Sequence, residues 1–252
     1  MPTYCERDNM RPLTDLIRRE FPAVKQILIV DDGSPDGTAE VARAIPGVTV
    51  LARTGSRGYG HSMRDGLRMA LANGADAVIT MDADLSHDAT ILPNLLEGLE
   101  RADLVIGSRY CQGSALVENW PWHRLLISRM ASSLIELCTG APVRDTTSGY
   151  RCWSRELLLH MELDSIQAGG FAFLYESLAQ ARRSGAAFLE LPNVYRGRIH
   201  GESKLNWSIA LEALRLLPGM FLQRVWEPIR PLPGRVSPYS RSTKASISAG
   251  EI

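Results

Sequence analysis

The sequence predicts an α/β fold with a mostly parallel sheet flanked by helices. Short apolar runs alternate with helical patterns along the first two-thirds of the chain, and acidic residues follow several of those runs. The composition is that of a globular protein, because 45% of the 252 residues are hydrophobic and 22% are charged. Strands that alternate with helices of about 10–15 residues indicate βαβ units, in which ligands bind at the carboxyl ends of the strands.

Apolar patterns predict the positions of the main elements. Four apolar runs predict strands at residues 27–30, 48–51, 77–81 and 104–106. Helical spacing of apolar residues predicts helices near residues 13–21, 62–71, 91–99, 124–138 and 175–184. Ser62 and Asp65 resemble a capping box, which would start the second of these helices at Ser62.

Charge and cysteine content exclude several functional classes. The 28 basic residues balance 28 acidic ones, which argues against a protein whose main activity is nucleic-acid binding. The four scattered cysteines lack the spacing of a zinc site, so we expect reduced thiols in a cytosolic protein. No basic and then apolar signal peptide opens the chain.

The sequence divides into a main domain, residues 1–204, and two C-terminal segments. Residues 205–227 are largely apolar, but Glu212, Arg215 and Arg224 interrupt the apolar run of residues 205–226, so we expect no simple transmembrane helix. This segment predicts an amphipathic, membrane-interfacial helix pair broken at Pro218-Gly219. The alternatives are packing on the protein's own core or on a partner's membrane helices. Residues 228–252 are rich in proline, serine and basic residues and predict a flexible tail.

The strongest local signal for chemistry is Asp82-Ala83-Asp84, which follows a predicted strand. On extended backbone, residues two apart point the same way, so both carboxylates can bind one hard cation. Mg²⁺ usually takes one or two protein carboxylates together with phosphate oxygens and water. The alternative is a solvated, aspartate-rich turn.

A second acidic motif, residues 30–38, follows the strand at 27–30 and contains Asp31 and Asp32. Carboxylates at a strand end can accept hydrogen bonds from ribose hydroxyls or a base edge, although a capped strand-to-helix turn is the alternative. A dinucleotide site is disfavoured, because no G-x-G-x-x-G follows a strand. The five histidines lack the H-E-x-x-H spacing of a zinc site, and no G-x-S-x-G nucleophile motif is present.

Cationic residues form a third signal, since arginine side chains suit phosphate oxygens. Taken singly, each is better explained as a surface charge, and only an arrangement around Asp82 and Asp84 would make a phosphate clamp. The residues concerned are Arg109, Arg124, Arg129, Arg151, Arg196, Arg198 and Lys204.

In order and spacing, seven motifs resemble those of the dolichol- and polyprenol-phosphate mannosyltransferases, a group within the inverting family 2 glycosyltransferases of GT-A fold. The motifs are Pro2-Thr3-Tyr4-Cys5-Glu6-Arg7, Val30-Asp31-Asp32-Gly33-Ser34-Pro35-Asp36-Gly37-Thr38, Met81-Asp82-Ala83-Asp84-Leu85-Ser86-His87, Gly107-Ser108-Arg109-Tyr110, Asn119-Trp120-Pro121-Trp122, Asp145-Thr146-Thr147-Ser148-Gly149-Tyr150-Arg151 and Gly201-Glu202-Ser203-Lys204. The resemblance runs from residue 2 to about residue 206. Relatives place an apolar strand before the first motif, and here that strand is missing or reduced to Met1.

The resemblance implies a GT-A nucleotide-diphospho-sugar transferase fold and assigns roles to individual residues. Asp82 and Asp84 would hold Mg²⁺ or Mn²⁺ on the donor diphosphate, and Ser86 would add an oxygen ligand. Arg124 would contact the acceptor phosphate, which makes Asp84, Arg109 and Arg124 the implied catalytic residues. The implied donor-binding residues are Pro2, Tyr4, Glu6, Val30, Asp32, Asp82, Ala83, Asp84, Arg109, Arg198 and Lys204.

The activity that this resemblance implies is inverting transfer of mannose from GDP-mannose to a polyprenyl phosphate at the cytoplasmic face of a membrane. The implied partners are a nucleotide sugar, the lipid phosphate and a membrane surface or a membrane-anchoring protein. One alternative is a polyprenyl-phosphate glucosyltransferase or another lipid-phosphate sugar transferase. The other is a truncated, non-catalytic relative that serves as a binding subunit.

Overall fold

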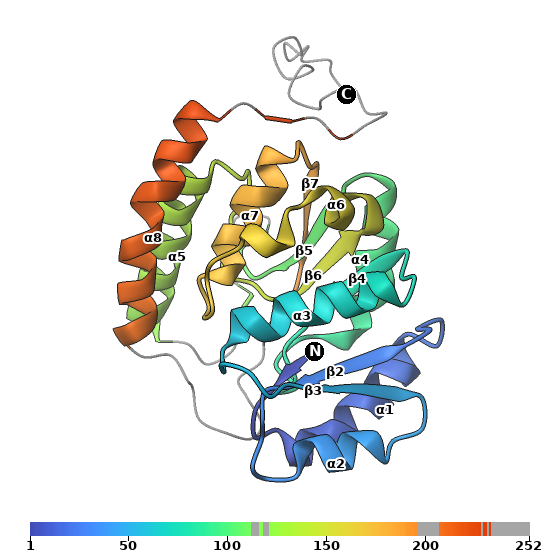
Figure 1. The fold of residues 1–252 in the computed structure, drawn as a ribbon. Coiled ribbons are helices and arrows are strands. Elements are labelled where there is room, and N and C mark those ends of the chain that lie inside the picture. Colours follow the sequence, from blue (N-terminus) through green and yellow to red (C-terminus); the bar gives the residue numbers. More distant parts are fainter. Residues whose placement is uncertain (112–115, 118–120, 196–206, 228, 231, 233–252) are drawn as a thin grey trace.

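The computed structural model describes residues 1–111, 116–117, 121–195, 207–227, 229–230 and 232, with the backbone alone for residues 207–214. Its strands form two sheets with helices on both sides (Figure 1). The first sheet is parallel and has the order β1 (Pro2–Thr3), β2 (Ile27–Asp31), β3 (Val48–Ala52). The second has the order β4 (Ala77–Thr80), β6 (Arg151–Ser154), β5 (Leu104–Ser108), β7 (Phe188–Pro192).

Strand pairing is parallel in three of the five described pairs, and the antiparallel pairs both involve β6. In the second sheet β6 runs antiparallel to both of its neighbours, whereas β5 and β7 are parallel. All four strands predicted from apolar runs are present, as β2, β3, β4 and β5. Each run is rich in β-branched residues, which fit a pleated and buried surface.

The first strand is present but very short. β1 contains two residues, and Pro2 and Thr3 lie opposite Val30 and Asp31 of β2. The amino group of Met1 donates a hydrogen bond of 2.8 Å to the carbonyl oxygen of Leu28. β1 is not paired with β4, so the strands form two separate sheets within the described chain.

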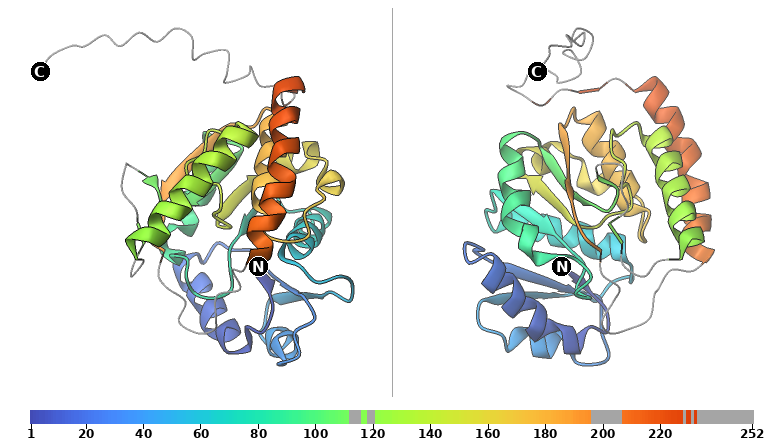
Figure 2. Two further views of the ribbon diagram at one scale, coloured as in Figure 1. Left: turned by 90° about the vertical axis from the view of Figure 1, so that its left-hand side faces the viewer. Right: turned by 180° about the vertical axis from the view of Figure 1, so that it is seen from behind.

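The helices cover the outer faces of the sheets (Figures 1 and 2). They are α1 (Met10–Glu20), α2 (Thr38–Arg43), α3 (Tyr59–Ala72), α4 (Leu92–Glu97), α5 (Trp122–Thr139), α6 (Arg155–His160), α7 (Phe173–Arg183) and α8 (Trp207–Trp226). Short 3₁₀ turns lie at η1 (Arg7–Asn9), η2 (Ala89–Ile91), η3 (Gly98–Glu100) and η5 (Leu163–Ser165). The five predicted helical regions therefore correspond to α1, α3, the η2–α4–η3 segment, α5 and α7.

The predicted start of α3 is wrong. The helix begins at Tyr59, and Ser62 lies inside it with 1% of its surface exposed. Asp65 does not cap the helix but forms an ion pair of 2.7 Å with Arg53. The tertiary contacts decide this boundary, because the backbone of Gly60 donates a hydrogen bond to the distant carbonyl of Gly169.

Two apolar clusters make up the core. One lies between the second sheet and helices α3, α5, α6, α7 and α8, around Trp153 and Phe173. The other joins α1, α2 and α4 to β2 and the opposite face of the second sheet, around Leu13 and Ile29. These clusters fix the strand ends in space and so position the loops that follow them.

The predicted break at Pro218-Gly219 is also wrong, because α8 continues through Pro218 as one helix of 20 residues. A proline inside a helix costs about 3 kcal/mol. Leu217 and Met220 flank it and are buried in the larger cluster, and burial of two such side chains contributes roughly 1.5–3 kcal/mol each. Packing on α5 and α7 therefore offsets the cost of Pro218.

The outer face of α8 remains exposed after its last buried residue. Its exposed apolar residues are Phe221, Leu222, Val225 and Trp226. None of the helices in the described part of the chain is both long enough and apolar enough to cross a bilayer.

Two substitutions separate the buried face of α8 from its exposed face. Leu217→Glu should lower the free energy of unfolding by more than about 3 kcal/mol, because it places a charge in an apolar cluster. Phe221→Glu should change it by less than about 1 kcal/mol, because that side chain is 42% exposed. Urea unfolding of both variants measures the difference, and equal losses would contradict this division of the helix.

Candidate functional site

The candidate site lies at the carboxyl ends of β1, β2 and β4. Two non-glycine residues of the described chain have left-handed backbone, Cys5 with φ 57° and Leu85 with φ 61°. Cys5 follows β1, and Leu85 follows Asp84. Non-glycine residues in this conformation cost free energy and cluster at functional sites. The strain therefore lies in the two loops that carry the predicted functional residues.

Asp31 and Asp32 have different roles at the end of β2. Asp31 accepts hydrogen bonds from the backbone and hydroxyl of Ser34, at 3.0 and 2.6 Å, and so closes the turn. Asp32 accepts a hydrogen bond of 2.7 Å from the backbone of Gly58 and forms an ion pair with Arg53. Asp32 thereby holds the loop of residues 53–58 against β2.

The same loop reaches the residues that follow β1. Arg57 donates a hydrogen bond of 2.5 Å to the hydroxyl of Tyr4, and its guanidinium lies 5.1 Å from the centre of that ring. The backbone of Glu6 donates to the Thr38 hydroxyl at 3.0 Å. The structure therefore brings Pro2, Tyr4, Glu6, Val30 and Asp32 to one end of the first sheet. Arg57 was not among the site residues that the sequence predicted. Its place directly before the glycines of Gly58-Tyr59-Gly60 was the feature that could have indicated a functional loop.

Asp82 and Asp84 lie in the bend after β4, and their surroundings differ. The Asp82 side chain is 33% exposed, and its carboxylate lies 3.4 Å from Nε2 of His87. Asp84 is 2% exposed and accepts a hydrogen bond of 3.1 Å from the backbone of Ser86. Ala83 and Ser86 are buried between and beyond them. One carboxylate of the pair is thus open to a ligand, and the other helps to shape the bend.

His87 connects this bend to the second sheet. Its ring is buried, lies 4.7 Å from the ring of Tyr150 and meets the ring of Tyr195 edge-on at 6.2 Å. The guanidinium of Arg109 lies 5.8 Å from the centre of the same Tyr195 ring. Sequence reasoning set His87 aside because it lacks metal-site spacing, but the structure places it between Asp82 and Arg109.

Arg109 is held by a buried carboxylate. Its Nε and Nη2 atoms donate to the two oxygens of Asp145 at 2.8 and 2.6 Å, and its backbone donates to the same group at 2.8 Å. Asp145 has no exposed surface. Although burial alone would raise the Asp145 pKa, Arg109 lowers it below its usual value, and Asp145 raises the pKa of Arg109. Both groups therefore stay charged, and the guanidinium is fixed beside Tyr195.

Arg151 is not the surface charge that the sequence suggested. It is fully buried and donates to the carbonyls of Ser148 and Thr146 at 2.8 and 3.1 Å and to the Ser177 hydroxyl at 2.9 Å. Burial lowers its pKa to about 10. Arg151 therefore orders the backbone of residues 146–148.

The remaining predicted cations are more widely spread. Arg124 lies exposed in the first turn of α5. The guanidinium of Arg129 lies 5.6 Å from the ring centre of Tyr110, which follows Arg109. Arg196, Arg198 and Lys204 lie outside the described residues.

Gly149 allows the 145–151 segment to approach Asp82. A Cβ atom at Gly149 would lie 2.6 Å from the Tyr59 hydroxyl and 3.3 Å from an Asp82 oxygen. Tyr59 in turn stacks on Phe171 at 4.8 Å, and burial raises its pKa well above the usual value, with Asp82 and Asp84 adding to the shift. A side chain at position 149 would force these segments apart, so glycine is required there.

The donor set suits a cation that is completed by its substrate. The described residues contain no group of three or more His, Cys, Asp or Glu side chains that would hold a metal ion. Asp82 and Asp84 supply hard carboxylate oxygens at the end of one strand, which fits Mg²⁺ or Mn²⁺ bound by one or two carboxylates together with phosphate oxygens. The site therefore fits a metal that arrives with a phosphate-containing ligand.

Comparison with known proteins gives a consistent result. Residues 1–161 match the family described as glycosyl transferase family 2. The chain is 37% identical over 220 residues to a polyprenol monophosphomannose synthase of Mycolicibacterium smegmatis, covering 85% of this chain and 82% of that protein. It is 38% identical over 234 residues to an undecaprenyl-phosphate mannosyltransferase of Micrococcus luteus, covering 91% of this chain and 96% of that protein.

Solved structures agree on the fold. A glucosyl-3-phosphoglycerate synthase from Mycobacterium tuberculosis with phosphoglyceric acid has a TM-score of 0.60 at 20% identity, covering 90% of this chain and 79% of that one. The same enzyme in complex with Mn²⁺, uridine-diphosphate and its product has a TM-score of 0.59 at 19% identity, covering 90% of this chain and 78% of that one. At this level of identity the likeness shows a GT-A-like fold.

We expect the buried Asp145–Arg109 ion pair to stabilise the folded protein. Asp145→Asn should lower the free energy of unfolding by about 3 kcal/mol at pH 7, because it leaves a buried guanidinium without its carboxylate. Since the native pKa of Asp145 is lowered, its contribution is present above pH 4 and is lost as the pH falls. Urea unfolding between pH 3 and pH 7 measures this. The difference in unfolding free energy between the original chain and the Asp145→Asn variant should become smaller below about pH 4.

A surface ion pair provides the control for this experiment. Asp164 pairs with Arg68, but its side chain is 80% exposed. Asp164→Asn should cost less than about 1 kcal/mol. A comparable loss for both variants would show that the Asp145 pair has no special structural role.

Proposed function

Because the chain belongs to glycosyltransferase family 2, we propose that it transfers mannose from GDP-mannose to a polyprenyl phosphate with inversion at the anomeric carbon. The observation that carries the proposal is the position of Asp82. Its carboxylate lies 3.4 Å from His87, whose ring meets Tyr195 edge-on, and the Arg109 guanidinium lies 5.8 Å from the centre of that Tyr195 ring. A donor diphosphate beside Asp82 would therefore find carboxylates that can hold a metal ion, and the Arg109 guanidinium, within the same site.

The donor nucleotide belongs at the end of the first sheet. We propose that Pro2, Tyr4, Glu6, Val30 and Asp32 surround the guanosine. Asp32 is held by Arg53 and by the backbone of Gly58, so its part is also to keep Arg57 beside Tyr4. An aromatic ring under a guanidinium offers a flat surface for a base, and the cation favours the nearby phosphates.

Mg²⁺ or Mn²⁺ on Asp82 and Asp84 would supply positive charge to the departing diphosphate. We propose that Arg109 stabilises the same charge, with Asp145 keeping its guanidinium in place. Arg198 and Lys204 would add phosphate contacts. Fixed positive groups of this kind stabilise developing charge without reorganisation during the reaction.

The acceptor requires little acid–base chemistry. A lipid phosphate monoester has a second pKa of about 6, so its oxygen is anionic near neutral pH and can attack directly. His87 is buried behind Asp82 and is not required as a base. We propose that Arg124, which is exposed at the start of α5, binds the acceptor phosphate and reduces its repulsion with the donor.

A lipid acceptor also requires access to a membrane, and α5 offers an apolar surface next to Arg124. Trp122 is 77% exposed and Ile127 is 65% exposed. The α5 stripe consists of the exposed residues Trp122, Leu126, Ile127, Met130, Leu134 and Leu137. α8 packs beside α5, and both helices face the viewer in the left view of Figure 2. We propose that this stripe and the exposed end of α8 dock on the bilayer, since apolar helices flanked by arginines suit a membrane interface.

A transfer assay tests the proposed reaction. The chain, with Mg²⁺ or Mn²⁺ and a short polyprenyl phosphate, should use radiolabelled GDP-mannose in preference to UDP-glucose and UDP-N-acetylglucosamine. Asp84→Ala should lower the rate by about 10²–10³-fold, and Asp82→Ala should be slightly less damaging. Because Asp84 also accepts a hydrogen bond within the bend, circular dichroism should confirm that the Asp84→Ala variant is folded. Asp164→Ala, on the exposed surface, should leave the rate unchanged.

Other outcomes identify the alternatives. Preferred use of UDP-glucose would make the chain a lipid-phosphate glucosyltransferase. No transfer, together with no rise in melting temperature at millimolar GDP and Mn²⁺, would favour a non-catalytic binding subunit, because a ligand of the native state must stabilise it. Retention of more than a tenth of the rate by Asp84→Ala would exclude the metal role.

Vesicle flotation tests the membrane surface. The chain should float with vesicles that contain anionic lipid, and an Ile127→Glu, Met130→Glu double variant should remain folded but float at least about tenfold less, since both side chains are exposed. Leu159→Glu is a matched control, because Leu159 is 60% exposed on α6 rather than α5. Unchanged flotation of the double variant would place the membrane contact elsewhere.

A further inference from the structure

His87 lies beside Asp82 because the chain bends sharply after β4. Leu85 has left-handed backbone with φ 61°, and the backbone of Ser86 donates a hydrogen bond of 3.1 Å to the Asp84 side chain. These two features turn the chain back on itself. Nε2 of His87 lies 3.4 Å from Oδ2 of Asp82, although the two residues are not neighbours in the chain. The strained bend therefore places an imidazole ring beside the more exposed carboxylate of the pair.

The His87 ring is held by packing. Its centre lies 4.7 Å from the ring centre of Tyr150 and 6.2 Å from that of Tyr195, and the side chain is only 4% exposed. The Tyr150 hydroxyl donates a hydrogen bond of 3.0 Å to the carbonyl of Asp88. The backbone of Asp88 in turn donates to the buried side chain of Asn193 at 3.3 Å. These contacts fix the ring and the residue that follows it.

The polar atoms of this buried ring are not satisfied within the described residues. Neither ring nitrogen of His87 has a hydrogen-bond partner there. A buried polar group without a partner is costly, and most such groups in proteins are paired. The separation of 3.4 Å between Nε2 and Oδ2 of Asp82 exceeds the roughly 2.7–3.2 Å of a formed N–H···O bond. A movement of about 0.5 Å would form that bond.

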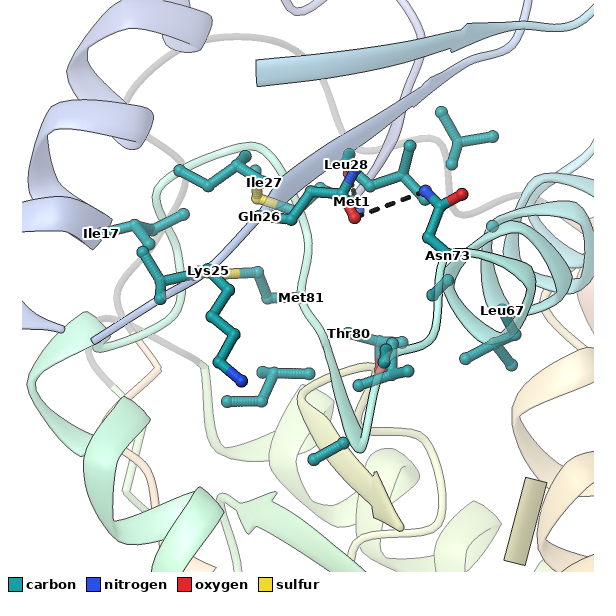
Figure 3. A pocket seen from close by; sticks show the side chains of 18 of the residues that line it. Met1, Ile17, Lys25, Gln26, Ile27, Leu28, Leu67, Asn73, Thr80 and Met81 are labelled. Atoms are coloured by element: carbon teal, nitrogen blue, oxygen red, sulfur yellow. Dashed lines mark hydrogen bonds between the residues drawn. The ribbon is translucent and has the colours of Figure 1, made fainter. Parts of the chain in front are cut away.

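The two oxygens of Asp82 have different neighbours. Oδ2 faces His87, whereas Oδ1 lies toward Gly149, where a Cβ atom would approach it to 3.3 Å. Thr80 and Met81, which precede Asp82, border a cavity of about 390 Å³ between β2 and β4 (Figure 3). Space beside these residues supplies no atom that could hold the carboxylate. Its orientation therefore depends on the groups that it contacts directly.

We propose that His87 is a positioning residue for Asp82, whose Oδ2 accepts a hydrogen bond from Nε2–H of the ring while Oδ1 is left for a divalent cation. This inference rests on the proposed function, because the cation is the one that arrives with the donor diphosphate. A carboxylate that is hydrogen-bonded by a fixed neighbour holds a metal ion in one orientation. Loss of such a neighbour typically weakens metal affinity about 10–100-fold.

Two substitutions separate the hydrogen bond from the packing. His87→Phe keeps an aromatic ring against Tyr150 and Tyr195 but removes the N–H donor. His87→Gln loses the ring but keeps an amide N–H that reaches a similar position. His160→Phe is the matched control, because His160 is exposed at the end of α6. Melting temperature and circular dichroism establish that each variant is folded.

Nucleotide binding with and without Mn²⁺ measures the effect. Titration calorimetry with GDP, and in parallel with UDP, gives the factor by which Mn²⁺ tightens binding to the original chain. In His87→Phe that factor should fall at least about tenfold, while binding without metal stays within about twofold. His87→Gln should recover most of the factor, and His160→Phe should match the original chain.

The original chain itself gives a second measurement, which does not depend on the folding of a variant. With ¹⁵N-labelled histidine, addition of Mg²⁺ and GDP should produce an imidazole N–H proton signal that exchanges slowly with water. Slow exchange is expected because the His87 ring is buried and its N–H becomes hydrogen-bonded. Absence of this signal would overturn the proposal.

The remaining outcomes distinguish this role from the proposed reaction. An unchanged Mn²⁺ factor in a folded His87→Phe chain, or no recovery in a folded His87→Gln chain, would overturn the positioning role even if mannose transfer is normal. Metal-dependent nucleotide binding without any sugar transfer would refute the reaction and leave the role of His87 intact. No effect of Mn²⁺ on either nucleotide in the original chain would overturn both.

Discussion

Asp145 has no exposed surface, and its charge is stabilised there mainly by the Arg109 guanidinium, which meets both carboxylate oxygens at 2.6 and 2.8 Å. The pair fixes the end of β5 against the 145–151 segment. Arg151, also buried, ties that segment to α7 through Ser177. Gly149 then reaches Asp82 without a clash, so the arrangement of the site depends on this buried pair of charges.

The site and the apolar surface of α5 are linked through the same region. Tyr110 follows Arg109 and donates a hydrogen bond of 2.6 Å to Ser128 of α5, while Arg129 lies over its ring. A change in the position of α5 would therefore displace the residues at the end of β5. This connection fixes the position of Arg109 relative to the exposed apolar face of α5.

Incomplete pairing between β2 and β4 distinguishes this fold from a single continuous sheet. Both strands are held mainly from their outer sides, β2 by β3 and β4 by β6, while helices cover the space between them. Asp32 and Asp82 follow these two strands. Within the described residues, the separation of Asp32 from Asp82 therefore depends mainly on the helices that pack between these two strands.

The sequence by itself determined strands β2, β3, β4 and β5, most helices, the two acidic motifs and the family resemblance, because these follow from local periodicity and from short motifs. It did not predict β6 or β7, whose places depend on pairing with β5. It did not determine that Arg151 is buried, that His87 lies between Asp82 and Arg109, or that α8 continues through Pro218. Each of these depends on partners far away in the chain. Asp82 and Gly149, for example, are separated by more than sixty residues, and only the packed sheet brings them into contact. Local pattern fixes which face of an element is apolar, whereas burial, ion pairing and the choice of helix ends depend on what packs against that face.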